Sequence, residues 1–305
     1  MDSSVIYQGF HLNCEKTRNM AKVSAPLSWT DKTYFCCAVT LYGIAMVYSV
    51  FLWRKGFQRD DWVVYGVLAG GLVLHTVAMA KRGFNLQACP INNLYEATAF
   101  IMWTIVAVNL VAGIWQRFRF VGAFASPLLF VLGVFALFPD LDPELANGTH
   151  EFSGALSSLH KALLMLSFGG FGLSAVGAVM YLTQEKDLKL HKFRAILSKL
   201  PSLERLETAM TRLVWIAFGL LTAGLITSSA YLHQVKQVWF KADPEMIWVM
   251  GVWAFYLVLL VLQKRHAHSG RRFAWCALGS FLFVLLTFWG VYLLSPLHQT
   301  SNAVS

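Results

Sequence analysis

Charged residues are scarce in this chain of 305 residues, of which only 13% are Asp, Glu, Lys or Arg. A soluble domain carries about 25% of such residues. The hydrophobic residues make up 57% of the chain and stand together in long blocks, without the spacing of an amphipathic surface helix. Blocks of this length are typical of helices that cross a bilayer. The composition therefore excludes a soluble globular domain and predicts a protein embedded in the lipid bilayer.

Several motifs that would assign a function are absent. The sequence has no HExxH motif, no phosphate-binding Walker loop and no Ser/His/Asp pattern, so a conventional hydrolase or an ATP-driven pump is not supported. The five cysteines show no CxxC spacing, and a Cys14–Cys89 disulfide is a weakly supported alternative to free thiols. The polar first 33 residues contain no apolar segment of the kind that a signal peptide needs, so no cleavable signal peptide is evident.

The apolar blocks predict an all-α, polytopic membrane protein with about eight transmembrane helices. Each block has close to the ~20 residues that cross a ~30 Å hydrocarbon core. The expected spans are 34–53, 62–81, 94–115, 120–138, 158–182, 213–232, 246–263 and 273–294. The fourth contains Pro127, which a membrane helix tolerates when a neighbouring group satisfies the freed carbonyl. Glycines in the fifth span, such as Gly170, are expected to be helix-packing notches, because no strand precedes them to form a nucleotide loop.

The loops between these spans alternate in charge. Basic residues gather after the first, third, fifth and seventh spans, whereas the loop 139–157 has acidic residues and no Lys or Arg. The positive-inside rule then places the basic loops in the cytoplasm and both chain termini outside. This orientation explains the net charge of +9 without a nucleic-acid partner. The basic loop 183–212 is expected to form an amphipathic helix broken at Pro201. The predicted organisation is a polar tail 1–33, a transmembrane domain 34–298 and a C-terminal tail 299–305.

Two histidines lie just outside different spans on the predicted outer side. His160 opens the fifth span after Ser157 and Ser158, which are good N-cap residues, and His298 follows the eighth span. Neutral imidazoles suit iron, and two of them at one depth can occupy both axial positions of a haem. Trp239, in the loop between the sixth and seventh spans, lies on the same side and can support the ring. The alternative is that each histidine is an ordinary polar residue at the membrane interface.

Three other ionisable side chains are candidate functional residues. His75 lies in the middle of the second span, where an ionisable residue is a functional candidate by default. An interhelical hydrogen bond to a Ser, a Thr or a backbone carbonyl explains it equally well, and it could also receive haem in transit. His233 is on the predicted outer side and competes for the ligand role. Glu96, behind Asn93 at the start of the third span, is a helix-start signal, because the helix dipole favours a carboxylate in the first turn.

Several stretches match, in order, motifs of one family. Residues 90–96 are similar to P-x-S-N-L-Y-E, residues 181–189 to Y-L-x-Q-E-x-x-L-K, and residues 200–204 to L-P-x-L-[DE]. Gly270-Arg271-Arg272 matches G-[RK]-R before the last span. Leu159-His160 and the later His298 stand where the family has its two external histidines. Together, over residues about 70–298, these stretches resemble the cytochrome c assembly family, the CcsA/HemX-like proteins of the System II maturation pathway.

The resemblance implies a function in cytochrome c maturation, as part of a haem-attachment complex. The protein would bind haem non-covalently, as a b-type haem, and present it at the outer face for attachment to apocytochrome c. His160 and His298 would be the axial ligands, with Trp239 and Asp243 in the haem-handling loop. The family has there a run like W-G-x-Y-W-x-W-D-P-K-E-x-W, of which residues 235–246 keep Trp239, Asp243 and Pro244.

The resemblance further implies a membrane partner with a large external domain, similar to CcsB or ResB, and a location in the bacterial inner (cytoplasmic) membrane. Two alternatives remain open. One is a HemX-like, non-enzymatic accessory or regulator of haem biosynthesis, which would recognise a partner through the basic loop 183–212. The other is a small-molecule permease with His75 in its path. The first predicts that deletions in that loop matter, and the second that His75→Ala has the dominant effect.

Overall fold

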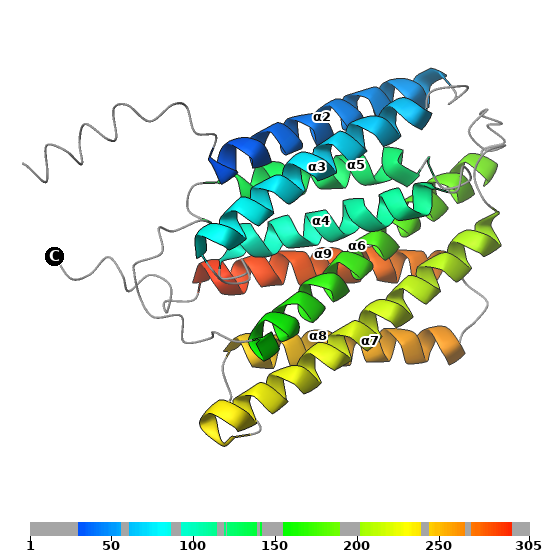
Figure 1. The fold of residues 1–305 in the computed structure, drawn as a ribbon. Coiled ribbons are helices and arrows are strands. Elements are labelled where there is room, and N and C mark those ends of the chain that lie inside the picture. Colours follow the sequence, from blue (N-terminus) through cyan, green and yellow to red (C-terminus); the bar gives the residue numbers. More distant parts are fainter. Residues whose placement is uncertain are drawn as a thin grey trace, which may run out of the picture.

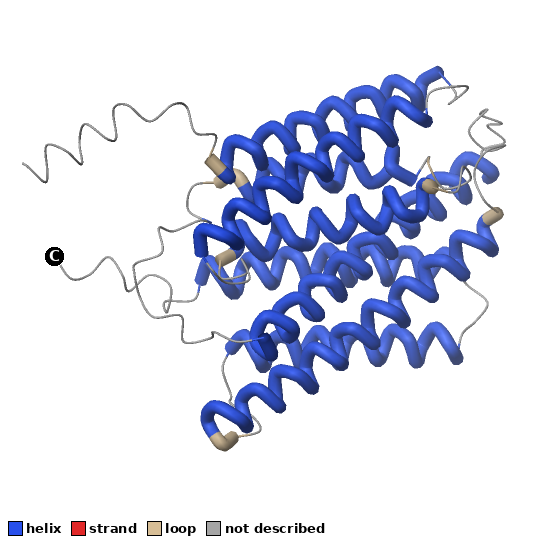
Figure 2. Tube along the Cα trace, viewed as in Figure 1, coloured by secondary structure: helices blue, strands red, loops and turns tan. Residues whose placement is uncertain are grey.

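The computed structural model describes residues 30–55, 61–86, 93–114, 119, 121–138, 141, 155–189, 202–238, 244–265 and 270–294. Within these ranges all regular secondary structure is helical, as Figure 2 shows. The helices are α2 (Asp31–Lys55), α3 (Asp61–Leu86), α4 (Leu94–Gly113), α5 (Val121–Ala136), α6 (Ala155–Lys189), α7 (Leu203–Lys236), α8 (Pro244–Arg265) and α9 (Gly270–Leu294). The predicted all-α polytopic fold is confirmed.

Helix length and apolar content agree with a membrane location. Among the described residues, seven helices are long and apolar enough to cross a membrane, and α5 is a shorter apolar helix of 16 residues. At 1.5 Å per residue, α5 rises about 24 Å, which is less than the ~30 Å of a hydrocarbon core. The fourth predicted span is therefore present, but it is shorter than the other seven.

Pro127 lies inside α5 without breaking it. Proline has no N–H, so it leaves the carbonyl of Ala123, four residues earlier, without its helical donor. The Ser126 hydroxyl donates to that carbonyl at 3.3 Å, and it also lies 3.3 Å from the hydroxyl of Ser49 on α2. A neighbouring polar group thus satisfies the freed carbonyl, as the sequence predicted.

The helices run roughly along one axis, and consecutive helices run in opposite directions (Figure 1). Helices α4 and α6 form the centre, since 72% of the apolar window of each is buried, against 22% for α7 and α8. Large apolar side chains such as Val47 and Ile226 are each 65% exposed on the outer helices. In a soluble protein such a surface would be an aggregation hazard, but here it fits contact with lipid.

The expectation for the loop 183–212 is wrong in part. Residues 183–189 are the last turns of α6, and residues 203–212 are the first turns of α7, so the described parts do not form a separate amphipathic helix. The two helices have 35 and 34 residues, well beyond the predicted spans 158–182 and 213–232. The hydropathy pattern detects only the part of a helix that suits hydrocarbon, whereas the helical backbone continues into polar surroundings. Pro201 lies outside the described residues.

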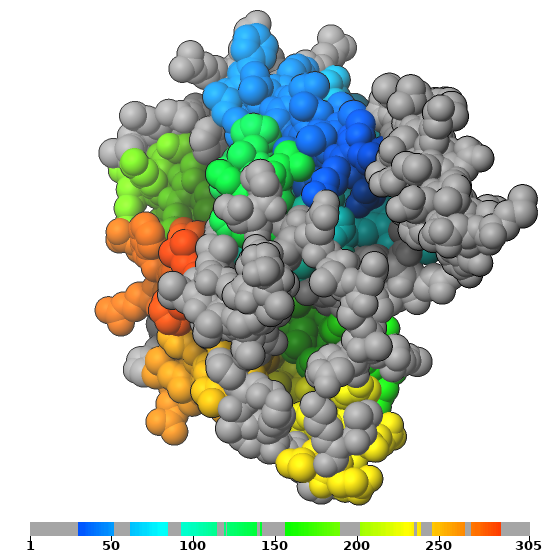
Figure 3. Space-filling model, turned by 90° about the vertical axis from the view of Figure 1, so that its left-hand side faces the viewer, coloured from blue at the N-terminus to red at the C-terminus, as the bar shows by residue number. Residues whose placement is uncertain are grey.

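The alternation of direction brings distant segments to one end of the bundle. Helices α2, α4, α6 and α8 begin there, and α3, α5, α7 and α9 end there, on the left of Figure 1. We call this the histidine end, because α6 carries His160 there, and the opposite end the basic end, where Lys189 closes α6 and Gly270 opens α9. Figure 3 views the histidine end, with α2 and α3 in blue at one edge and α7 in yellow at the other.

Candidate functional site

His160 lies in the second turn of α6, at the histidine end. Because α6 begins at Ala155, Ser157 and Ser158 are inside the helix, and the prediction that they cap it is wrong. Ser157 is 3% exposed, so this first turn is packed against the rest of the protein. Tertiary packing contributes most of the stability of a helix turn in a folded protein, and here it outweighs the preference of serine for the cap position.

The imidazole of His160 is held by the backbone of α7. Its Nδ1 lies 2.8 Å from the carbonyl oxygen of Gly224, and because a carbonyl can only accept, Nδ1 carries the proton and donates. In a neutral ring this tautomer leaves the lone pair on Nε2. Metal-bound histidines commonly donate their second ring N–H to a backbone carbonyl in this way, which fixes the ring and raises its basicity. The hydrogen bond therefore orients the His160 ring and leaves its lone pair on Nε2.

Gly224 allows α6 and α7 to approach closely at this point. A Cβ at residue 224 would lie 2.9 Å from Cδ2 of Leu164 and 3.5 Å from Cβ of Leu163, both one turn beyond His160 on α6. Further along the same pair, a Cβ at Gly170 would lie 2.9 Å from Cβ of Ala217. The predicted packing role of the fifth-span glycines is confirmed, and the same close packing brings the carbonyl of residue 224 within reach of the imidazole.

The other predicted haem residues fall elsewhere. His298, Trp239 and Asp243 lie outside the described residues. Their flanking helices are described: α7 ends at Lys236, α8 begins at Pro244 and α9 ends at Leu294, all at the histidine end (Figure 1). The sequence therefore attaches these three residues to helix ends that share one end of the bundle with His160.

His75 is fully buried on α3 and faces α2. Its Nδ1 lies 3.2 Å from the hydroxyl oxygen of Tyr42, and the ring of Phe35 meets it edge-on with 5.0 Å between centroids. The sequence predicted a Ser, Thr or backbone partner and missed Tyr42. The Tyr42 ring reaches His75 across Gly71, where a Cβ would lie 2.5 Å from that ring, and the sequence alone does not record this contact. The Nε2 atom has no hydrogen-bond partner of ordinary geometry among the described residues.

Glu96 is part of an ion cluster that sequence analysis missed. Asn93 caps α4 as predicted, with its Oδ1 accepting from the Glu96 backbone N–H at 2.8 Å. The Glu96 carboxylate also accepts from Nε of Arg82 at 2.5 Å, and Nη1 of Arg82 lies 3.0 Å from Oδ2 of Asp31. The cluster therefore ties the ends of α2, α3 and α4 together beside the ring of Tyr95, whose centroid lies 4.9 Å from the guanidinium. An arginine on the side with few basic residues was the unused signal.

The described residues contain no group of three or more His, Cys, Asp or Glu side chains that could hold a metal ion. A haem needs less from the protein than a bare ion, because the porphyrin itself supplies the ligands in its plane and only axial positions remain. The single oriented imidazole of His160 is thus chemically suited to haem iron.

Comparison with known proteins identifies the family of this chain. A family model described as "Cytochrome C assembly protein" matches residues 91–298, which is more than half of the chain. This chain belongs to the cytochrome c assembly protein family. The match covers α4 to α9 together with His160, Trp239, Asp243 and His298, whereas α2, α3 and His75 precede it.

Three curated relatives of this cytochrome c assembly family member carry the name "Cytochrome c biogenesis protein CcsA". One from Prochlorococcus marinus (strain MIT 9215) is 26% identical over 77% of this chain and 83% of its own length. Another from Prochlorococcus marinus (strain MIT 9303) is 24% identical over 90% of this chain and 94% of its own length. A third, from Synechococcus sp. (strain RCC307), is 27% identical over 75% of this chain and 80% of its own length.

Proposed function

We propose that this protein acts in cytochrome c maturation by binding haem at the histidine end and presenting it for attachment to apocytochrome c. Membership of the cytochrome c assembly family and the name of the relatives support the pathway. The observation that carries the haem-binding step is the hydrogen bond from Nδ1 of His160 to the Gly224 carbonyl, which directs the Nε2 lone pair toward a ligand role.

In this proposal His160 is one axial ligand of a b-type haem and His298 is the other. Trp239 packs on the ring, and Asp243 belongs to the same haem-handling loop. His75 is a structural residue of the α2–α3 contact, because Tyr42 already engages its Nδ1 and the ring is fully buried. The outer-facing orientation follows from the basic loops at the opposite end. The protein would then belong to a bacterial inner (cytoplasmic) membrane.

The chemical contribution of the chain would be placement. Haem is the cargo, and it supplies the group to which the apocytochrome becomes attached. The protein contributes an oriented imidazole on a closely packed helix pair. Holding two reactants in position is worth several orders of magnitude in rate. A membrane partner with a large external domain, similar to CcsB or ResB, would bring the apocytochrome to this site.

The test is the absorption spectrum of the detergent-purified full chain after loading with haem. Wild-type protein should give the bands of a six-coordinate, bis-histidine haem. His160→Ala and His298→Ala should each abolish the six-coordinate bands, because each removes one axial nitrogen. His160→Gly loaded in the presence of free imidazole should regain them, since the small ligand can occupy the space left by the side chain.

His233→Ala is the matched variant, because His233 lies at the same end of the bundle on α7 and competes for the ligand role. Its spectrum should equal that of the wild type. A six-coordinate spectrum that persists in His160→Ala and disappears in His233→Ala would refute the assignment of His160. A wild-type protein that takes up no haem would overturn the proposal and favour a non-enzymatic accessory of haem biosynthesis.

A further inference from the structure

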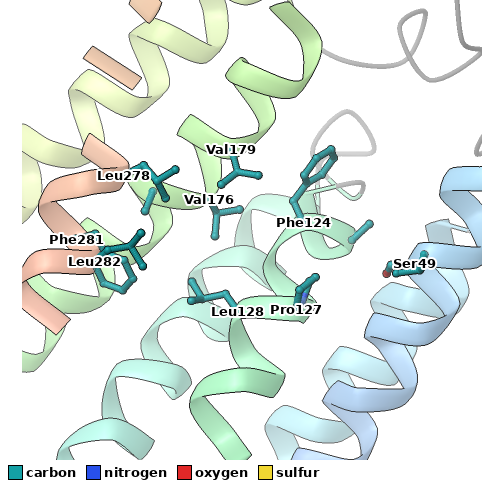
Figure 4. Close-up of a pocket in the computed structure, with 12 residues that line it drawn as sticks. Ser49, Phe124, Pro127, Leu128, Val176, Val179, Leu278, Phe281 and Leu282 are labelled. Carbon is teal, nitrogen blue, oxygen red and sulfur yellow. The ribbon is translucent and has the colours of Figure 1, made fainter. Parts of the chain in front are cut away.

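A cavity of about 220 Å³ lies between α2 and α5 on one side and α6 and α9 on the other, toward the basic end (Figure 4). Its walls are apolar apart from the hydroxyl of Ser49. Side chains of all four helices line it, including Leu128 of α5, Val176 of α6 and Leu282 of α9. The cavity is remote from His160, which lies at the opposite end of α6.

The cavity opens on the outer surface of the helix bundle. Three residues of its wall are also exposed on the outer surface of the bundle: Val50 at 49%, Val179 at 36% and Leu282 at 45%. Water gains nothing from entering an apolar space of this kind, and an empty space would forfeit dispersion contacts along its whole lining. Taking about 30 Å³ for a water-sized group, the volume holds roughly seven methylene groups. A segment of one acyl chain fits, whereas a ring system of haem's size does not.

Two cations stand where the head group of such a lipid would lie. Lys186 follows Val179 by seven residues on α6, and Arg271 precedes Leu278 by seven residues on α9. Seven residues are close to two helical turns, so each cation is on the same face as the cavity residue, about 10 Å nearer the basic end.

The positive charges of Lys186 and Arg271 are accessible to a ligand. Lys186 is exposed and has no ion pair within the described part of the chain. Arg271 has a side chain that is 58% exposed and lies 3.5 Å from Glu185, which also pairs with Lys189 at 2.6 Å. The carboxylate of Glu185 is therefore shared by two cations, and a second carboxylate, that of Glu207, lies beside Gly270. Lys186 stands next to this group as an exposed cation.

We infer that this cavity holds one acyl chain of an anionic phospholipid, whose head group pairs with Lys186 and Arg271. The bilayer leaflet at the basic end supplies the lipid. The acyl chain of this lipid fills the space beside the short helix α5 and packs between α5 and the α6–α9 pair.

Native mass spectrometry of the full chain in detergent tests this, with dioleoylphosphatidylglycerol and dioleoylphosphatidylcholine added in equal amounts. The wild type should retain one phosphatidylglycerol in preference to phosphatidylcholine. Lys186→Gln should reduce that preference about five-fold, the effect of one cation near a membrane surface. Val179→Trp should reduce retention of both lipids, because the indole closes the mouth of the cavity.

Helix α8 offers matched controls, since Val258 is 56% exposed and precedes the exposed Arg265 by seven residues at the same end of the bundle. Val258→Trp and Arg265→Gln should retain lipid as the wild type does. Equal effects in the two helices would mean general lipid contact and would overturn the inference, as would unchanged retention in Val179→Trp or capture of another apolar molecule in place of phospholipid. Lys186→Gln changes an exposed side chain, so its preference for phosphatidylglycerol still tests the inference if Val179→Trp does not fold.

Discussion

Removal of the Arg82 guanidinium by Arg82→Met should destabilise the protein more than any loss of an exposed ion pair. Arg82 bridges the carboxylates of Glu96 and Asp31, at 2.5 and 3.0 Å, and the Glu96 side chain is 1% exposed. Removing one partner of a buried ion pair lowers the free energy of unfolding by roughly 3–5 kcal/mol, because the other charge is left without compensation.

The lower end of that range applies here. The Arg82 and Asp31 side chains keep 13% and 20% of their exposure, so water can reach part of the cluster. The dipole of α4 continues to favour the Glu96 carboxylate in its first turn. We expect a loss of about 3 kcal/mol. At roughly 2–4 °C per kcal/mol, the melting temperature should fall by about 6–12 °C.

The assay is thermal unfolding of detergent-purified protein followed by tryptophan fluorescence. Arg271→Met is the matched control, since Arg271 lies 3.5 Å from Glu185 with a side chain that is 58% exposed, and an exposed pair is worth about 1 kcal/mol or less. Adding Glu96→Gln to Arg82→Met should recover part of the loss, because no buried charge then remains. A decrease no larger than that of the control, or strictly additive losses in the double variant, would refute the reasoning.

Two further predictions concern the helix contacts. Gly224→Val should press on Leu164 and separate α6 from α7. Haem binding should then weaken about 10- to 100-fold, as expected for loss of the partner of a metal-binding histidine. Gly219→Val is the control, because nothing lies within 4 Å of its new Cβ, and its haem titration should equal that of the wild type. Equal haem affinities of the two variants would contradict this. Tyr42→Phe should lower the free energy of unfolding by about 1–3 kcal/mol, because Nδ1 of His75 loses its partner, and the haem spectrum should not change. An altered spectrum would instead give His75 a role in haem binding.

The sequence by itself determined the class of fold and the family. Eight apolar blocks predicted, in order, the eight helices α2 to α9 of the described residues, because a hydrocarbon core demands about twenty apolar residues for each crossing. The Asn93 cap on α4 was also predictable, since both partners lie within one helical turn. The positions at which the polar ends of α6 and α7 stop could not be predicted, because hydropathy detects only the part of a helix that suits lipid.

Tertiary structure alone decided the partners of the functional side chains. His160 meets a carbonyl 64 residues away, His75 a hydroxyl 33 residues away, and Arg82 a carboxylate 14 residues away on the next helix. No local period or motif records such pairs, because they depend on which helices lie side by side and on their relative rotation. The identity of His160 as a candidate ligand was therefore readable in the sequence, but the hydrogen bond that orients its imidazole came only from the packing of α6 against α7.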